Sequence, residues 1–223
     1  MSLLDTIISS LAPHRCVGCD AEGALLCNDC QSKVPKIPPR CYRCHRLAVY
    51  NRTCRSCRSS SRLYAAHIAT PYDDLAKTLI WKLKFDGAQA AAVTIAACLR
   101  EVLPSDENRQ YLIVPVPTAT SRVRRRGYDQ AKLVARALAQ QARLPYLDCL
   151  QRSGQAHQVG ASRYERLRQL KNSFRVVHKR RVQDAHIILV DDVVTTGATL
   201  EAAAAALKSA GVRRVEAMAF AQP

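Results

Sequence analysis

The sequence predicts an α/β fold with a mostly parallel sheet, preceded by a small cysteine-rich unit. Eight of the ten cysteines stand within the first 60 residues, where they recur at regular spacing. Beyond them, apolar segments of strand length alternate with helical segments of about 10 to 15 residues. This alternation is typical of a parallel sheet covered by helices on both faces. We therefore expect two domains, one over residues 1–60 and one over residues 61–223.

The N-terminal segment predicts a short amphipathic helix, because its larger apolar residues recur at helical spacing. These residues are Leu3, Leu4, Ile7, Ile8 and Leu11. The segment lacks the basic start and the small-residue cleavage pattern of a signal peptide. The chain also contains no run of about 18 apolar residues. We therefore expect a cytoplasmic protein without a membrane span.

The cysteines of the first domain form four Cys-x-x-Cys pairs. A two-residue spacing lets two thiolates on one tight turn take adjacent corners of a tetrahedron, so two such turns complete a structural Zn²⁺ site. Disulfides are the alternative, but they rarely persist in the reducing compartment expected here. Two zinc sites are therefore predicted, with the ligands Cys16, Cys19, Cys27, Cys30, Cys41, Cys44, Cys54 and Cys57.

Two pairings of the four turns are open. Neighbouring turns can share a metal, or alternate turns can do so as a cross-brace. Sequential pairing leaves loops of 7 and 9 residues between the turns, which suit a zinc ribbon, and makes "KVPKIPPR" a stiff spacer between two units. We favour the sequential pairing. Closed sites of four thiolates have no position for a substrate, so we expect the zinc to be structural.

The second domain alternates strands and helices along its length. The predicted strands are residues 64–71, 111–117, 186–192 and 213–221. The predicted helices are residues 75–85, 88–103, 131–142 and 197–211. The strand "HIILV" is apolar throughout, as a central strand buried on both faces should be. Ligands bind such sheets outside the carboxyl ends of the strands, so the residues after this strand are candidates for a site.

The stretch "IILVDDVVTTGATL" predicts a sugar phosphate site at such an end. A helix begins here, and the unpaired N–H groups and positive dipole of its first turn favour a phosphate. Gly197 lets the backbone approach a ligand closely. Asp191 and Asp192 would repel a phosphate, so we assign them to the hydroxyl groups of a ribose. Three threonine hydroxyls line the same turn, from Thr195, Thr196 and Thr199.

The same stretch resembles the phosphoribosyl-diphosphate (PRPP) binding motif of type I phosphoribosyltransferases. The resemblance extends over essentially the whole chain. Four Cys-x-x-Cys pairs, "LKF", "IVPVPTATSRVRRRGYDQA" and "RYERLRQLKNSF" precede the motif, in an order similar to that of the ComF family of competence-associated, phosphoribosyltransferase-like proteins. The resemblance implies a type I phosphoribosyltransferase fold behind a double zinc ribbon. It also implies a role in natural transformation, where the family is associated with handling incoming single-stranded DNA.

The resemblance implies roles for individual residues. It places PRPP on Asp191, Asp192, Val193, Thr195, Thr196, Gly197, Ala198 and Thr199, with the two acids on the ribose as the catalytic candidates. It places pyrophosphate on a loop of backbone N–H groups and hydroxyls, namely Pro117, Thr118, Ala119, Thr120 and Ser121. Mg²⁺ would bridge pyrophosphate and ribose oxygens, in keeping with its preference for oxygen ligands. Some relatives carry an acid where this chain has Thr195. This difference narrows the range of acceptor molecules that an enzyme of this type could use.

A basic stretch follows the pyrophosphate loop. Residues 122–181 hold 16 Lys/Arg against 3 Asp/Glu, so we expect phosphate-rich partners. Four arginines could anchor PRPP or a nucleic-acid backbone: Arg122, Arg124, Arg125 and Arg126. Aromatic residues make up only 5% of the chain, which counts against a dedicated binder of single strands.

Relatives have a flexible loop over the active site at the position of "LQRSGQAHQVGASRYERLRQLKNSF". Gly154 and Gly160 suit a mobile lid. Arg152 and Gln158 could reach the substrate when the loop closes.

Two functions fit the sequence. The first is a PRPP-binding protein of the ComF type that handles single-stranded DNA in natural transformation, with a helicase-like competence protein as a partner. The alternative is an active, Mg²⁺-dependent phosphoribosyltransferase of nucleotide salvage or metabolism. In that enzyme Asp191 and Asp192 would hold the ribose while positive charge develops at C1. The acceptor that it would use has no recognisable motif.

Overall fold

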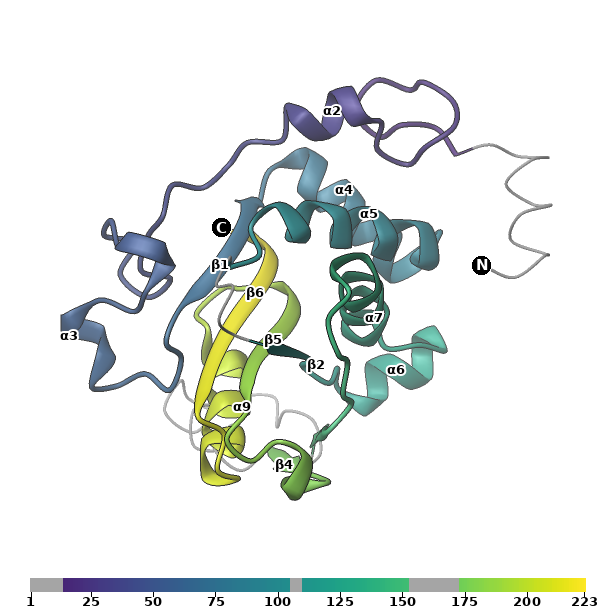
Figure 1. Cartoon of the computed structure of the whole chain (residues 1–223). Helices are drawn as coiled ribbons and strands as arrows, with labels where there is room; N and C mark the ends of the chain where they lie inside the picture. The colour runs from purple at the N-terminus through teal and green to yellow at the C-terminus, as the bar shows by residue number, and fades with distance from the viewer. Residues whose placement is uncertain (1–13, 105–109, 153–172) are drawn as a thin grey trace, which may run out of the picture.

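The computed structural model describes residues 14–104, 110–152 and 173–223. These residues build a parallel sheet of four strands in the spatial order β1, β6, β5 and β2 (Figure 1). The strands are β1 (Ala66–Pro71), β2 (Tyr111–Pro115), β5 (His186–Val193) and β6 (Arg214–Gln222). The parallel sheet predicted from the sequence is confirmed. The predicted N-terminal helix, and Gly154, Gln158 and Gly160 of the predicted lid, lie outside the described residues.

The central strand β5 is buried on both faces of the sheet. Leu189 pairs with β2 on one side and with β6 on the other, and the side chains of residues 187–190 are fully buried. The strand runs to Val193, one residue further than predicted, because Val193 still pairs with β6. Asp191 and Asp192 therefore lie inside β5, just before its last residue, rather than in the loop after it.

Three helices cover one face of the sheet: α4 (Asp74–Phe85), α5 (Ala88–Glu101) and α7 (Gln130–Ala142). Each helix buries a single apolar stripe, as an amphipathic helix on a sheet does. Leu83, Ile95 and Leu138 are fully buried there, together with Ile113 and Phe220 of the sheet. Burying one such side chain contributes about 1.5 to 3 kcal/mol, so this face holds α4 firmly in place.

The helix α9 (Ala198–Ser209) covers the other face. Ala203 and Ala204 are fully buried and lack bulk, so the helix lies close to the sheet. Leu200 and Leu207 fill the remaining space. Among the described residues, no helix is both long enough and apolar enough to cross a membrane.

Shorter elements connect these layers. They are the helices α2 (Asn28–Ser32), α3 (Arg55–Arg58) and α6 (Thr120–Arg126), the 3₁₀ helices η1 (Val49–Asn51) and η2 (Lys179–Arg181), and an antiparallel pair of strands, β3 (Leu150–Arg152) and β4 (Phe174–Val176). Leu150 and Phe174 of the small sheet belong to the same core as α9.

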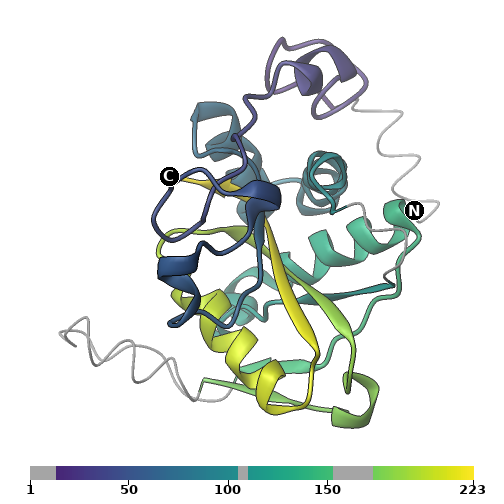
Figure 2. The same ribbon diagram turned by 60° about the vertical axis from the view of Figure 1, so that its left-hand side comes forward.

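The cysteines lie in two units on opposite faces of the sheet. The first unit, residues 16–30, packs on the side of α4 and α5, where Leu25 joins the core (Figure 1). The second unit, residues 41–57, lies beside α9, where Tyr42 joins the core (Figure 2). The proline-containing spacer runs between the two units along the outside of the sheet.

Candidate functional site

The carboxyl end of β5 carries two fixed carboxylates. Asp191 Oδ1 accepts a hydrogen bond of 2.9 Å from the N–H of Asp192, and Asp192 Oδ1 accepts one of 2.9 Å from the N–H of Val193. Asp192 is only 8% exposed. Hydrogen bonds to the strand's own backbone thus orient both side chains before any ligand arrives.

Lys84 of α4 provides the positive charge that Asp192 requires. Its ammonium nitrogen lies 2.9 Å from Asp192 Oδ2, and both side chains are largely buried, with exposed fractions of 24% and 11%. Our sequence analysis did not assign Lys84 to the site. The signal that could have found it is the tripeptide "LKF", in which a lysine occupies the last turn of an otherwise apolar helix.

The charge of one arginine, Arg152, interacts with that of Asp191. Burial, and then the charge of Asp192, raises the pKa of the Asp191 carboxyl well above its ordinary value. Burial and the charge of Arg122 lower the pKa of Arg152, while the charge of Asp191 acts in the opposite direction. The guanidinium of Arg152 also lies over the ring of Phe174, 5.6 Å from its centre. Asp191 of β5 and Arg152 of β3, both predicted site residues, therefore interact electrostatically, and Arg122 of α6 interacts with Arg152.

The predicted phosphate loop connects β5 to α9. Gly197 adopts a left-handed conformation with φ of 71° and is the residue before the helix. Thr195 and Thr196 are exposed, and Thr196 Oγ1 accepts a weak hydrogen bond of 3.4 Å from the N–H of Ala198. A phosphate placed here would meet the first turn of a twelve-residue helix, where the helix dipole favours an anion.

The second cysteine unit forms the wall behind this loop. A Cβ atom added to Gly197 would lie 2.5 Å from Cε2 of Tyr42. The Tyr42 hydroxyl donates to Glu201 in the first turn of α9, and Glu201 also accepts from the N–H of Arg62 over 2.8 Å. Burial, followed by the hydrogen bond to Glu201, raises the pKa of Tyr42, so the phenol stays protonated. No local pattern in the sequence connects Tyr42 with the loop.

The predicted pyrophosphate loop is held by an acid that the sequence analysis did not single out. The N–H and the hydroxyl of Thr118 both donate to the carboxylate of Asp129, over 3.0 and 2.9 Å. Asp129 also accepts from the N–H of Ala131 as the N-cap of α7. Thr118 is therefore oriented toward α7 in this structure. Thr120 and Ser121 begin α6 and are exposed.

The four predicted arginines of α6 have different surroundings. Arg122 is exposed, and its charge lowers the pKa of Arg152. Arg126 lies instead over the ring of Phe85 on α4, 5.2 Å from the ring centre. Arg124 and Arg125 are exposed.

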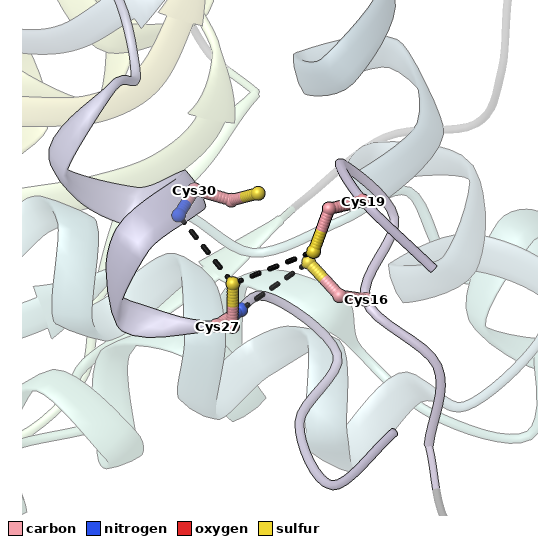
Figure 3. A group of neighbouring side chains, drawn as sticks. All are labelled: Cys16, Cys19, Cys27 and Cys30. Carbon is pink, nitrogen blue, oxygen red and sulfur yellow. Dashed lines mark hydrogen bonds between the residues drawn. The ribbon is translucent and has the colours of Figure 1, made fainter. Parts of the chain in front are cut away.

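Within the described part of the chain, the cysteines form two clusters, each with all four sulfur atoms within 4.8 Å of one another. The clusters consist of Cys16, Cys19, Cys27 and Cys30 (Figure 3), and of Cys41, Cys44, Cys54 and Cys57. The predicted sequential pairing is confirmed. Zn–S bonds of about 2.3 Å in a tetrahedron separate neighbouring sulfurs by about 3.8 Å. The sulfurs of Cys19 and Cys27 lie 3.7 Å apart and those of Cys44 and Cys54 lie 3.5 Å apart, so both clusters could hold zinc.

Hydrogen bonds to sulfur in the first unit favour a metal-bound thiolate. Burial opposes ionisation of Cys16, but the N–H groups of Cys27 and Gly18 donate to its sulfur and lower its pKa to about 6. The neighbouring sulfurs of Cys19 and Cys27 raise the pKa of Cys30 to about 12. A bound dication would favour the ionised form of all four sulfurs, so Cys30 would ionise together with Cys16. In the second unit, a hydrogen bond with the Ser56 hydroxyl and then the N–H of Cys57 lower the pKa of Cys54 to about 6. The sulfur of Cys54 and then burial raise the pKa of Cys57 to about 12.

Comparison with known proteins finds relatives over most of the chain. The chain is 28% identical to competence protein F of Haemophilus influenzae, over 93% of this chain and 96% of that protein. It is 29% identical to competence protein ComFC of Bacillus subtilis, over 83% of this chain and 79% of that protein. It is 33% identical to the DNA utilization protein YhgH of Salmonella typhi, over 62% of this chain and 63% of that protein. These relatives confirm the predicted resemblance to the ComF family.

A family model described as the phosphoribosyl transferase domain matches residues 70–223. The matched range contains the two acids at the end of β5, the loop that follows them and the arginines of α6. It also contains the four-stranded sheet except for the first residues of β1. The chain therefore belongs to the phosphoribosyl transferase domain family.

Proposed function

We propose that this protein binds PRPP at the carboxyl end of β5 and acts in natural transformation, where it handles incoming single-stranded DNA in the cytoplasm. The observation that carries the first part is the arrangement of two oriented carboxylates directly before a glycine-containing loop and a helix N-terminus. The names of relatives, competence protein F and DNA utilization protein, support the second part.

The site offers one kind of group for each part of PRPP. The 5′-phosphate lies on the N–H groups and hydroxyls of residues 195–199, and the ribose hydroxyls donate to Asp191 and Asp192. The charge of Arg152 interacts with those of Asp191 and Arg122, and the two arginines would balance the charge of the diphosphate. Mg²⁺, bound with PRPP through oxygen ligands, would neutralise part of the negative charge at the carboxyl end of β5.

We further propose that both cysteine clusters hold structural zinc. The distances between sulfur atoms fit a tetrahedron of thiolates, and hydrogen bonds already stabilise ionised sulfur at Cys16 and Cys54. Eight thiols arranged in this way, rather than as disulfides, suit a reducing compartment. This chemistry supports the cytoplasmic location.

Active transfer of the phosphoribosyl group is the second candidate function. It is favoured by the cations next to the acids, because Lys84 and Arg152 would stabilise departing pyrophosphate while the carboxylates face the positive charge at C1. Release of pyrophosphate from PRPP and Mg²⁺ in the presence of a panel of bases, amines and DNA measures this activity. Turnover with any acceptor establishes the enzyme, and binding without turnover leaves a PRPP-binding protein.

A melting experiment tests the PRPP site. Ligand at about 100 times its Kd stabilises a native state by about 2.7 kcal/mol, which in a chain of this size raises Tm by about 5 to 10 °C. We expect this shift with PRPP and Mg²⁺, and a smaller shift with ribose 5-phosphate. A variant with both Asp191→Ala and Asp192→Ala should fold, with its zinc content unchanged, and show no shift. An unchanged Tm of the wild-type protein at saturating PRPP would remove the proposal.

A further inference from the structure

Two large aromatic side chains on α4 face the solvent. Trp81 is 53% exposed and Phe85 is 56% exposed. Their ring centres are 5.9 Å apart, with an angle of 45° between the planes. The opposite stripe of the helix, which contains Leu79 and Leu83, is completely buried. The aromatic pair therefore lies on the solvent side of α4, outside the buried core.

The arginine-bearing helix α6 lies against this aromatic pair. The guanidinium of Arg126 lies 5.2 Å from the centre of the Phe85 ring, and the Tyr128 hydroxyl donates to the carbonyl of Leu83 over 2.9 Å. These two contacts hold the end of α6 on the last turns of α4. Arg124 and Arg125, the two residues before Arg126, are exposed.

The charge of this surface is positive and largely uncompensated. In residues 14–104, 110–152 and 173–223, no carboxylate lies within 4.0 Å of a guanidinium nitrogen of α6. Asp86, the residue after α4, is paired with Lys82 over 3.1 Å. A ligand that covers this surface therefore brings both negative charge and flat apolar groups.

We propose that the surface formed by Trp81 and Phe85 of α4 and by Arg124, Arg125 and Arg126 of α6 binds single-stranded DNA. Two unpaired bases stack on the aromatic rings, and the adjoining phosphates lie on the exposed Arg124 and Arg125. Arg126 already adopts the arrangement in which a guanidinium and an aromatic ring face each other. This proposal rests on the proposed handling of DNA, and it assigns the contact with DNA to this surface.

Single strands fit this surface better than duplex DNA does. In a duplex the faces of the bases are hidden in the stack, so the two rings could not be used. In a single strand every base offers a π-face, and the contact is tolerant of sequence. The low aromatic content counted against such a binder in the sequence, but the structure places two of the few aromatics beside the arginines.

The surface borders the proposed PRPP site without overlapping it. Lys84 lies between Trp81 and Phe85 in the sequence of α4, yet its ammonium group points to Asp192. The helix α4 therefore contributes Lys84 to the proposed PRPP site and the two aromatic rings to the proposed DNA surface. Removal of the two rings should leave PRPP binding intact.

The single tryptophan of the chain makes the contact directly observable. We would titrate the full-length, zinc-loaded protein with a fluorescein-labelled dT₂₀ oligonucleotide and, separately, follow tryptophan emission with an unlabelled one. Stacking of a base on Trp81 should quench this emission. Since a stacked base contributes about 1 to 3 kcal/mol, a variant with Trp81→Ala and Phe85→Ala should bind dT₂₀ at least about tenfold more weakly.

Two further variants separate stacking from charge and from general surface effects. Changing Arg124 and Arg125 to Ala should reduce the slope of log K against log salt by about 1.4, because each phosphate contact contributes about 0.7 for single strands. The matched control changes Leu47→Ala and Tyr50→Ala, which remove comparable exposed apolar surface on the second unit (80% and 72% exposed). It should bind dT₂₀ as the wild type does.

The outcomes distinguish this proposal from the function on which it rests. Wild-type protein that binds no dT₂₀ at low salt contradicts DNA handling itself. Wild-type protein that binds without quenching, or equally well in the aromatic double variant, keeps DNA handling but overturns this surface and leaves the aromatic pair as a contact for a protein. An unchanged Tm shift with PRPP in the double variant shows that any loss of DNA binding is local.

Discussion

The ring of Tyr42 lies directly against the backbone of Gly197, leaving no room for even a methyl group between them. Tyr42 stands between two cysteines of the second unit, and Gly197 stands at the start of α9 in the proposed phosphate loop. The Tyr42 hydroxyl also donates to Glu201, one turn into that helix. The second unit is therefore the support on which the phosphate loop rests.

We predict that Gly197→Ala destabilises the protein more than the same change at another left-handed glycine. Alanine at positive φ costs about 1 to 2 kcal/mol, and the clash with Tyr42 should add about 1 to 3 kcal/mol. Gly87 is the matched control, because its φ of 70° is the same while nothing lies within 4 Å of an added Cβ. Urea unfolding measures both variants.

A change at Tyr42 should relieve the clash. In a Tyr42→Ala background, Gly197→Ala should cost about as much as Gly87→Ala does in the wild-type background. Equal costs of the two glycine changes in the wild type would show that the tyrosine does not restrict the loop.

We predict that the two zinc sites differ in their effect on PRPP. Cys57→Ser and Cys30→Ser occupy equivalent positions, and each should lower zinc content from about two to about one per chain. Loss of the second site should loosen Tyr42 and weaken PRPP binding about tenfold. Loss of the first site should change it little, because that unit packs on α4 and α5 away from the loop. Elemental analysis measures the zinc content, and calorimetry measures the affinity for PRPP. Equal weakening of PRPP binding in the two variants would contradict the assignment of the second unit as the support of the phosphate loop.

We predict that Lys84→Met destabilises the protein by about 3 kcal/mol, because it leaves the buried carboxylate of Asp192 without its partner. Adding Asp192→Asn should recover most of this loss. Lys82→Met, on the same helix, removes the more exposed pair with Asp86 and should cost less than about 1 kcal/mol. Chemical denaturation compares the three. Similar losses of stability for Lys82→Met and Lys84→Met would show that the Lys84–Asp192 pair contributes no more than an exposed ion pair does.

We predict that the ligand-free protein loses stability as pH rises above the ordinary range of a carboxyl group. The folded pKa of Asp191 is raised, so the native state holds a proton that the unfolded state has released. The stability from this group is complete below the unfolded pKa and is lost as pH rises through the folded pKa. Asp191→Asn should flatten this dependence and raise Tm near neutral pH while it reduces the response to PRPP. A steeper loss in the variant would contradict the assignment.

Features that depend on local pattern could be predicted from the sequence. The apolar strand "HIILV", the helices that alternate with strands and the sequential pairing of the Cys-x-x-Cys turns each follow from spacing within a few tens of residues. The PRPP motif belongs to the same class, because strand, acids, loop and helix are consecutive. These elements account for the sheet and for the position of Asp191 and Asp192.

Contacts between distant segments could not be predicted in this way. Tyr42 against Gly197, Lys84 beside Asp192 and Asp129 with Thr118 all depend on how the layers pack. Periodicity also could not show that Trp81 and Phe85 face the solvent, because they belong to the same apolar helix as the buried leucines. The arginine run looked like one group, and only the structure assigns Arg122 and Arg126 to different neighbours. The helicase-like partner stays a prediction.

A crystal structure of the protein with PRPP and Mg²⁺ tests the central claim most directly. We predict the 5′-phosphate at the N-terminus of α9, within hydrogen-bond distance of the N–H groups of residues 196–199. The ribose hydroxyls should lie on Asp191 and Asp192, with the ring of Tyr42 still against Gly197. A sugar bound elsewhere, or one whose hydroxyls turn away from both acids, would contradict this account.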